Sequence, residues 1–284
     1  ESMLHRARLR SGHAQPDFAG IVVVEGSPDD LRAVAVELRD EPTVEVVWFE
    51  SLLPPPPLDL APPSDDFFDQ QGYLFEESMN VVEAWGMGLD GSGMRLTDVE
   101  YGWQVTHEEF NEIDTNPEPG QTVHPDAVAM GHVEHGTAVI GILVADPGDY
   151  GVRGIAPFAE LYTYPEWTVE EGPRRSAAVA NAFADAVPGD VVLLEMQVEE
   201  NLSGEFGPAE LDAGIWMLTQ AATEGGIIVV AAAGNGGLDL DGPELSYYRE
   251  RGDSGALMVG AGEPYSREPL FYSTHGDRVN VQGW

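Results

Sequence analysis

Hydrophobic and polar positions along this chain follow two alternating periods, and the changes of period predict its elements. Residues 18–25 (FAGIVVVE) are rich in β-branched residues and predict a strand. Ser27-Pro28 is a typical helix start, and apolar residues then recur at helical spacing to about Arg39. Residues 43–50 (TVEVVWFE) predict a second strand. We therefore expect a small strand–helix–strand (βαβ) unit over residues 18–52, preceded by a polar arm over residues 1–17.

A proline-rich stretch over residues 53–66 separates this unit from the rest of the chain and predicts an extended linker. Beyond it, over residues 67–284, short apolar runs alternate with helical patterns. Nearly continuous apolar strands between helices are typical of a parallel sheet that is buried on both faces, so we expect the α/β class. The predicted strands cover residues 95–99, 160–164, 191–196, 227–233 and 256–260, and the predicted helices 135–145, 176–186 and 208–224.

Three polar residues lie where this pattern places strand or helix ends. Asp98 ends an apolar strand, His135 opens a helix, and Asn235 follows the apolar strand 227–233. In parallel α/β sheets such groups collect at the carboxyl ends of the strands. A hydrolase with a serine nucleophile needs a histidine base, a carboxylate that orients the histidine and a hydrogen-bond donor for the oxyanion. The three residues are therefore candidates for these roles.

The same residues belong to an ordered set of segments that resembles the subtilisin-like serine peptidases (subtilase family, S8) from about Asp66 to Trp284. The most specific segments are His135-Gly136-Thr137, Gly154-Ile155-Ala156-Pro157 and Ala232-Ala233-Gly234-Asn235, in this order. The resemblance implies a three-layer subtilisin-like fold with a mainly parallel central sheet, incomplete in this chain. It also implies that residues 18–52 are a prodomain-like unit.

The resemblance further implies a function and roles for the candidate residues. It implies a serine endopeptidase that hydrolyses peptide bonds in protein or peptide substrates. His135 would be the general base, Asp98 its orienting carboxylate and Asn235 the oxyanion donor. The alternative is a catalytically inactive binding or regulatory protein on the same fold.

Two departures from the family pattern bear on the site. The family usually follows its Asp with Ser or Thr and then Gly, whereas Asp98 is followed by Val99-Glu100-Tyr101-Gly102. Glu100 is thus a rival carboxylate on the same face of the strand, although we favour Asp98. Where the family usually has Ser-x-Gly on the strand that pairs with substrate, this chain has Glu195-Met196-Gln197. We expect these three residues, with Ala233 and Gly234, to line the substrate site.

The nucleophile is the missing part of the predicted triad. The serines that follow Asn235 do not lie in Gly-Thr-Ser, the family's nucleophile motif; they are Ser246, Ser254, Ser266 and Ser273. We expect the nucleophilic serine on a segment after Trp284. That segment is either a bound C-terminal fragment, left by autoprocessing of a zymogen, or a continuation of the same chain.

Composition limits the partners of the protein. The chain has 50 acidic and 13 basic residues, a net charge of −37, and no cysteine. Such a charge disfavours binding to nucleic acid and to anionic membranes, and the absence of cysteine removes disulfides and thiolate chemistry. We expect a secreted or cell-surface protein, with the cytoplasm as the alternative.

Metal binding is a further possibility that the histidines raise. His132 and His135 form an H-x-x-H pattern, with His124 and Asp126 nearby. We favour a structural or exposed His132 over a metal ligand and expect no metal at the catalytic site. Calcium is possible in so acidic a chain, but no EF-hand pattern supports it, and the short loop 146–152 argues against a site there.

Overall fold

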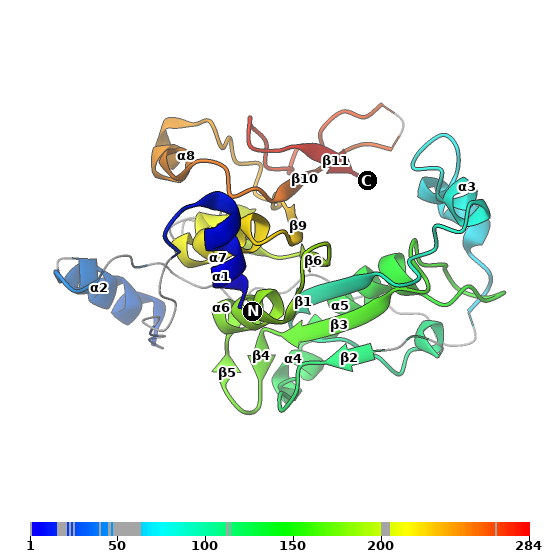
Figure 1. Cartoon of the computed structure of the whole chain (residues 1–284), viewed down its shortest axis with the longest axis horizontal. Helices are drawn as coiled ribbons and strands as arrows, with labels where there is room; N and C mark the ends of the chain where they lie inside the picture. Colours follow the sequence, from blue (N-terminus) through cyan, green and yellow to red (C-terminus); the bar gives the residue numbers. More distant parts are fainter. Residues whose placement is uncertain are drawn as a thin grey trace.

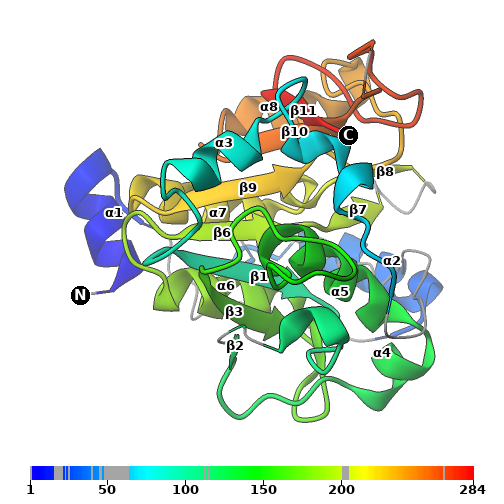
Figure 2. The same cartoon turned by 90° about the vertical axis from the view of Figure 1, so that its right-hand side faces the viewer.

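A seven-stranded parallel sheet forms the centre of the molecule. The computed structural model describes residues 2–15, 22, 24, 26–39, 41–44, 47, 64–111, 113, 115–199, 205–264 and 266–284. The strand order is β11-β10-β9-β6-β1-β3-β2, and all six pairings are parallel (Figure 1, Figure 2). This confirms the predicted α/β class. The strands are β1 (Arg95–Glu100), β2 (Thr115–Pro117), β3 (Glu160–Pro165), β6 (Val191–Leu194), β9 (Ile228–Ala232), β10 (Leu257–Ala261) and β11 (Val281–Gly283).

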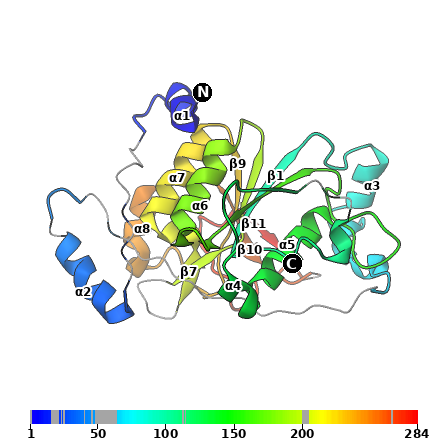
Figure 3. The same ribbon diagram turned by 90° about the horizontal axis from the view of Figure 1, so that it is seen from below.

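Helices cover both faces of the sheet and complete three layers. Figure 3 shows α6 (Arg175–Asp185) and α7 (Ala213–Glu224) on one side and α5 (His132–Val144) on the other. Successive residues of β1 point to opposite faces. Val99 belongs to the core cluster with α6 and α7, whereas Leu96 packs with the cluster around Ile140 of α5. The even-numbered residues of β1, which include Asp98 and Glu100, therefore face α5.

Short elements connect and flank these layers. Two antiparallel hairpins pair β4 (Trp167–Thr168) with β5 (Gly172–Pro173), and β7 (Gln197–Glu199) with β8 (Phe206–Pro208). The single helix predicted over residues 208–224 is wrong, because Asp212 has an extended backbone (ψ 122°) that separates a 3-10 turn at Ala209–Leu211 from α7. The described residues also form the short helices α3 (Val81–Gly86), α4 (Pro125–Ala129) and α8 (Ser246–Arg251) and 3-10 turns at Phe68–Gln70, Gly72–Leu74, Glu108–Phe110 and Pro243–Leu245.

The N-terminal segment, expected as a polar arm, instead forms helix α1 (Met3–Ser11), which packs on α7 (Figure 3). The Ser2 hydroxyl accepts a hydrogen bond from the His5 amide and caps the helix start, and Gly12 ends the helix with φ 75°. Met3 and Ala7, four residues apart, are buried. Met3 and the partly buried Leu4 pack against the main core cluster, and the Arg6 guanidinium donates to the Ala186 carbonyl at 2.8 Å, so that these contacts attach α1 to the domain.

Only part of the predicted βαβ unit lies within the described residues. Its helix is present as α2 (Pro28–Arg39), and the Ser27 hydroxyl accepts from the Asp30 amide at 3.3 Å, as the predicted cap requires. The predicted strands over 18–25 and 43–50, and the linker up to residue 63, lie largely outside the described residues. The prodomain-like unit therefore stays a prediction. None of the described helices is both long and apolar enough to cross a membrane.

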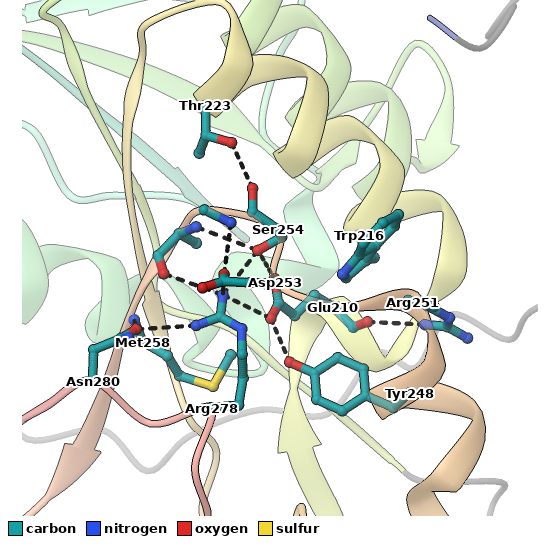
Figure 4. A network of polar contacts seen from close by, with 12 residues as sticks. Glu210, Trp216, Thr223, Tyr248, Arg251, Asp253, Ser254, Met258, Arg278 and Asn280 are labelled. Atoms are coloured by element: carbon teal, nitrogen blue, oxygen red, sulfur yellow. Dashed lines mark hydrogen bonds and ion pairs between the residues drawn. The ribbon is translucent and has the colours of Figure 1, made fainter. Parts of the chain in front are cut away.

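A buried ionic network fixes the C-terminal third of the chain (Figure 4). The carboxylate of Glu210 accepts hydrogen bonds from the hydroxyls of Tyr248 and Ser254 and forms an ion pair with Arg278 at 3.0 Å. The Arg278 guanidinium also donates to the Ser254 hydroxyl and to the Ala256 carbonyl. Glu210 is 2% exposed, so it needs these partners, and they connect the turn before α7 to α8 and to the chain that follows β10.

Candidate active site

The carboxyl ends of β9, β6 and β1 lie side by side at one edge of the sheet. These strands lead directly to Asn235, Glu195 and Glu100, respectively. His135 lies in the first turns of α5, the helix that covers the face to which Glu100 points. The parallel sheet thus brings together groups that are far apart in the sequence.

His135 and Glu100 form the central pair of this site. The distance from His135 Nδ1 to Glu100 Oε1 is 2.6 Å, and the Glu100 side chain is only 3% exposed, against 27% for His135. A carboxylate at Nδ1 favours the imidazole tautomer that carries its free lone pair on Nε2, and it stabilises the imidazolium once a proton is taken up. His135 is therefore oriented to act as a base through Nε2.

Asp98, which the sequence favoured as the partner of His135, has a different partner in the structure. It is fully buried, and its Oδ2 accepts a hydrogen bond from the indole Nε1 of Trp103 at 2.7 Å. Glu100 lies two positions nearer the carboxyl end of β1, on the same face, and reaches the imidazole instead. The available signal was Gly102, which stands two residues after Glu100 and so keeps the carboxylate-x-Gly spacing of the family.

The carboxyl groups at this edge lie in an environment that disfavours their charged forms. Burial, and next the charge of Glu100, raise the pKa of Asp98 well above its ordinary value. Burial, and next the charges of Glu166 and Glu195, do the same to the pKa of Glu100. Burial also raises the pKa of Glu195, while the nearby His135 acts in the opposite direction. Two buried acids, Asp98 and Glu100, and the partly buried Glu195 thus lie beside the imidazole.

The expected substrate-binding residues divide into two groups. Gln197 lies next to Asn235, and its side-chain oxygen accepts a hydrogen bond from the main-chain N–H of Asn235 at 2.9 Å. Met196 and Ala233 are 5% and 1% exposed, and their side chains pack in core clusters, so their place at the substrate site stays a prediction. The alternation of a strand explains the burial of Met196, since Met196 shares the buried face of Leu194.

Two glycines set the position of Asn235. Gly234 has φ 91°, and a Cβ there would lie 2.6 Å from the backbone carbon of Gly207. A Cβ on Gly236 would lie 2.2 Å from the Phe206 carbonyl oxygen. This loop therefore packs directly on the backbone of β8, and only glycine fits on either side of Asn235, which is itself exposed.

His132 is in the first turn of α5 rather than before the helix, and it is buried. It is 1% exposed and lies against the rings of Tyr101 and Trp167, with centroid distances of 4.8 and 6.3 Å. Burial lowers the pKa of His132, which favours the neutral imidazole. The ring of His124 stacks on Trp167 at 4.7 Å. Both histidines therefore have a structural environment.

In the part of the chain that the structure describes, no group of three or more histidine, aspartate or glutamate side chains is arranged to hold a metal ion. Beside the short loop 146–152, the carboxylates of Glu109 and Asp146 accept hydrogen bonds from the amides of Val152 and Asn111, both at 2.8 Å. Backbone donors thus already bind one oxygen of each of these two carboxylates.

Comparison with known proteins gives one family. Residues 64–283 match the subtilase family, Peptidase S8. Proprotein convertase subtilisin/kexin type 4 of Rattus norvegicus is 26% identical over 267 residues, which cover 83% of this chain and 36% of that protein. The major intracellular serine protease of Bacillus subtilis (strain 168) is 28% identical over 181 residues, covering 60% of this chain and 53% of that protein. The chain therefore spans about a third to a half of the length of these relatives.

Solved structures show the same fold. The nisin leader peptidase NisP from Lactococcus lactis superposes with a TM-score of 0.53 at 18% identity, covering 77% of this chain and 69% of that one. The psychrophilic subtilisin-like protease Apa1 from the Antarctic psychrotroph Pseudoalteromonas sp. AS-11 gives a TM-score of 0.50 at 20% identity, covering 68% of this chain and 42% of that one. At these identities the likeness concerns the architecture of the sheet and its helices.

Proposed function

This chain belongs to the subtilase family, and from that premise we propose that it carries the base and oxyanion side of a serine endopeptidase site. The observation that carries the proposal is the 2.6 Å contact between His135 Nδ1 and the buried carboxylate of Glu100. His135 Nε2 takes the proton of the attacking serine and later gives it to the leaving amine. Glu100, rather than Asp98, holds the imidazole in place and stabilises its charged form.

Asn235 is the proposed oxyanion donor. Its backbone is fixed by Gln197 and by the flanking glycines, while its side chain is exposed at the edge where β9 ends. A donor held in advance at that place stabilises negative charge that develops on the carbonyl oxygen of the substrate. Glu195 and Gln197, which follow β6, are proposed to lie along the bound peptide.

The attacking serine is proposed to come from outside residues 1–284. Two of the sequence candidates are occupied by structural hydrogen bonds. The Ser254 hydroxyl donates to Glu210, and the Ser273 hydroxyl donates to the Thr274 carbonyl while it accepts from the Ala261 amide. A serine on a C-terminal segment of the same protein, continuous or cleaved by autoprocessing, would complete the triad. Residues 18–52 are proposed to be the prodomain-like unit of a secreted or cell-surface zymogen.

The decisive experiment treats the full-length protein with a fluorophosphonate probe and weighs every polypeptide present. The probe reacts only with an activated serine, so we expect one label, on sequence beyond Trp284, together with cleavage of a peptide substrate. His135→Ala should abolish both. A wild-type protein that takes up no label and cleaves no peptide would contradict the proposal and support an inactive binding protein.

Asn235→Ala in the same protein tests the oxyanion role. We expect kcat to fall by about 10²–10³, with little change in KM, because the lost hydrogen bond forms only as the oxyanion develops. Asp239→Ala, an exposed change in the same loop, is the matched control. An equal loss in both variants, or a loss confined to KM, would show that Asn235 supports the loop or binds substrate instead.

A further inference from the structure

Asp98 is a buried acid for which the proposed mechanism has no use. It is 0% exposed, and its hydrogen-bond donor is the indole of Trp103 rather than His135. Its other oxygen, Oδ1, has no hydrogen-bond partner among the described residues. Burying a carboxyl group is costly unless its hydrogen bonds offset the loss of water, so the single bond to Trp103 calls for an explanation.

Trp103 connects Asp98 to the turn that carries His135. A Cβ placed on Gly136, the next residue after His135, would lie 3.0 Å from both Cδ1 and Nε1 of the indole. The same Cβ would lie 2.4 Å from the Gly102 carbonyl oxygen. The nitrogen-bearing edge of the indole therefore rests directly on the helix backbone at Gly136, and Asp98 holds that edge.

A second contact attaches the same segment to the same turn. The Gln104 amide donates to the Thr137 hydroxyl at 2.8 Å, and that hydroxyl donates to the Val133 carbonyl at 2.6 Å. Residues 102–104 thus contact α5 at Gly136 and at Thr137, the two residues that follow His135. Because Glu100 lies only two residues before this segment, any shift of α5 at Gly136 changes the distance between Glu100 and His135.

We propose that Asp98 is a positioning residue that acts through Trp103: its carboxyl group fixes the indole on Gly136 and thereby keeps His135 aligned with Glu100. This inference rests on the proposed peptidase function. Asp98 itself makes no hydrogen bond to His135, and in this proposal it does not contact the reacting atoms. An error of about 1 Å in such an alignment typically costs about 10²-fold in turnover.

The charges around Asp98 determine which substitution is informative. The acids Glu100 and Glu195 face it, and Trp103 and His135 are the groups that favour its ionised form. A neutral carboxyl group still offers a carbonyl oxygen to the indole, so the bond to Trp103 does not depend on the charge of Asp98. Asp98→Asn therefore keeps the acceptor, whereas Asp98→Val removes it.

The test measures kcat and KM of the full-length peptidase with a peptide substrate. We expect Asp98→Asn to retain most of the wild-type kcat, and Asp98→Val to lose about 10²-fold in kcat with KM little changed. Trp103→Phe should cause a similar loss, and Asp98→Val combined with Trp103→Phe should lose no more than the larger single loss, because both changes break one bond. If Asp98 were the orienting carboxylate, Asp98→Asn would lose about 10⁴ in kcat, and the inference would be overturned.

Hydrogen exchange of the Trp103 indole N–H, which does not depend on peptidase activity, tests the role of Asp98 separately from the proposed function. In full-length protein labelled with ¹⁵N-tryptophan, the indole N–H of Trp103 is assigned by its loss in Trp103→Phe. We expect its exchange with solvent to quicken in Asp98→Val and to stay slow in Asp98→Asn. If the exchange rate were the same in the wild type, Asp98→Val and Asp98→Asn, Asp98 would not hold the Trp103 indole, even if the peptidase is active. Failure of fluorophosphonate labelling with slow, Asp98-dependent exchange would refute the peptidase function alone.

Discussion

At the scale of single residues, the side-chain length of Glu100 and its position on β1 determine how the proposed base, His135, is oriented. Glu100 is the last residue of β1, and its side chain reaches His135 Nδ1 at 2.6 Å while remaining 3% exposed. A hydrogen bond between a buried carboxylate and an imidazole strengthens as the imidazole takes up a proton, because water competes weakly there. The hydrogen bond between Glu100 and His135 would therefore stabilise the transition state of the proposed reaction more than the resting state.

Glu100→Gln tests this role directly. The amide has nearly the same shape but carries no charge to stabilise the imidazolium, and it can select the wrong tautomer of His135. We expect kcat to fall by about 10⁴ in steady-state assays of the full-length protein, with KM little affected. Glu77→Gln, at an exposed site, is the matched control. If Glu100→Gln retained activity close to wild type, another carboxylate would have to be the group that orients His135.

The sequence identified His135 and Asn235 as candidates but not the partner of His135. Asp98 and Glu100 share one face of one strand, and the choice between them depends on which carboxylate reaches the imidazole across the gap to α5. That distance depends on the packing of α5 on β1, including the contact of Trp103 with Gly136, which no spacing in the sequence reports. The burial of Met196 was not visible in the sequence for a related reason, since a largely apolar stretch conceals which of its residues face the core.

At the scale of elements, the periodic patterns predicted the sheet well and the N-terminus poorly. The strands β1, β3 and β9 begin and end within about a residue of the predicted ranges. Of these, β9 has the continuous apolar run that a buried parallel strand leaves in the sequence. Helix α1 has only Met3 and Ala7 as buried apolar residues, set among arginines. Its stability comes from packing on α7, which is a tertiary effect that local pattern does not show.

Met3→Ala tests the packing of α1 on α7. Met3 is 5% exposed, and its Cγ lies 3.5 Å from the position of a Cβ on Gly225, the residue that follows α7. We expect the free energy of unfolding, measured by urea denaturation, to fall by about 2 kcal/mol, or the amides of α1 to lose exchange protection if the helix detaches first. Leu9→Ala, at a site 67% exposed in the same helix, should change stability by less than about 0.5 kcal/mol. Equal effects would show that α1 contributes through helix propensity alone.

At the scale of the whole molecule, the large negative charge has two parts that respond differently to solution conditions. The net charge is −37, and among the described residues many acidic side chains are exposed, so that salt screens their mutual repulsion. The acids beside His135 are different, because burial rather than surface repulsion is the main cause that raises their pKa. Salt should therefore weaken the effect of surface repulsion on the pH dependence of stability, and it should leave most of the effect of the acids beside His135.

The raised pKa values of the acids beside His135 predict that the protein becomes less stable as the pH rises, and Glu195→Gln tests this for one of these acids. The folded protein holds a proton on Glu195 above the ordinary value of 4.5, whereas the unfolded chain releases it there. The folded state then binds more protons than the unfolded state, so the free energy of unfolding falls as the pH rises from about 4.5 to the raised pKa. Each pH unit within this window costs up to about 1.4 kcal/mol for one group.

Glutamine cannot titrate, so the unfolding free energy of Glu195→Gln should fall less steeply over that window. The stability difference between the variant and the wild type should grow with pH and then level off above the raised pKa. The measurement is urea denaturation of both proteins from pH 4.5 to 8 in high salt, where surface repulsion is screened. Glu77→Gln, which removes an exposed charge, should follow the wild-type curve. Parallel curves for Glu195→Gln and the wild type would mean that Glu195 ionises freely in the folded protein, with water reaching its carboxylate beside His135.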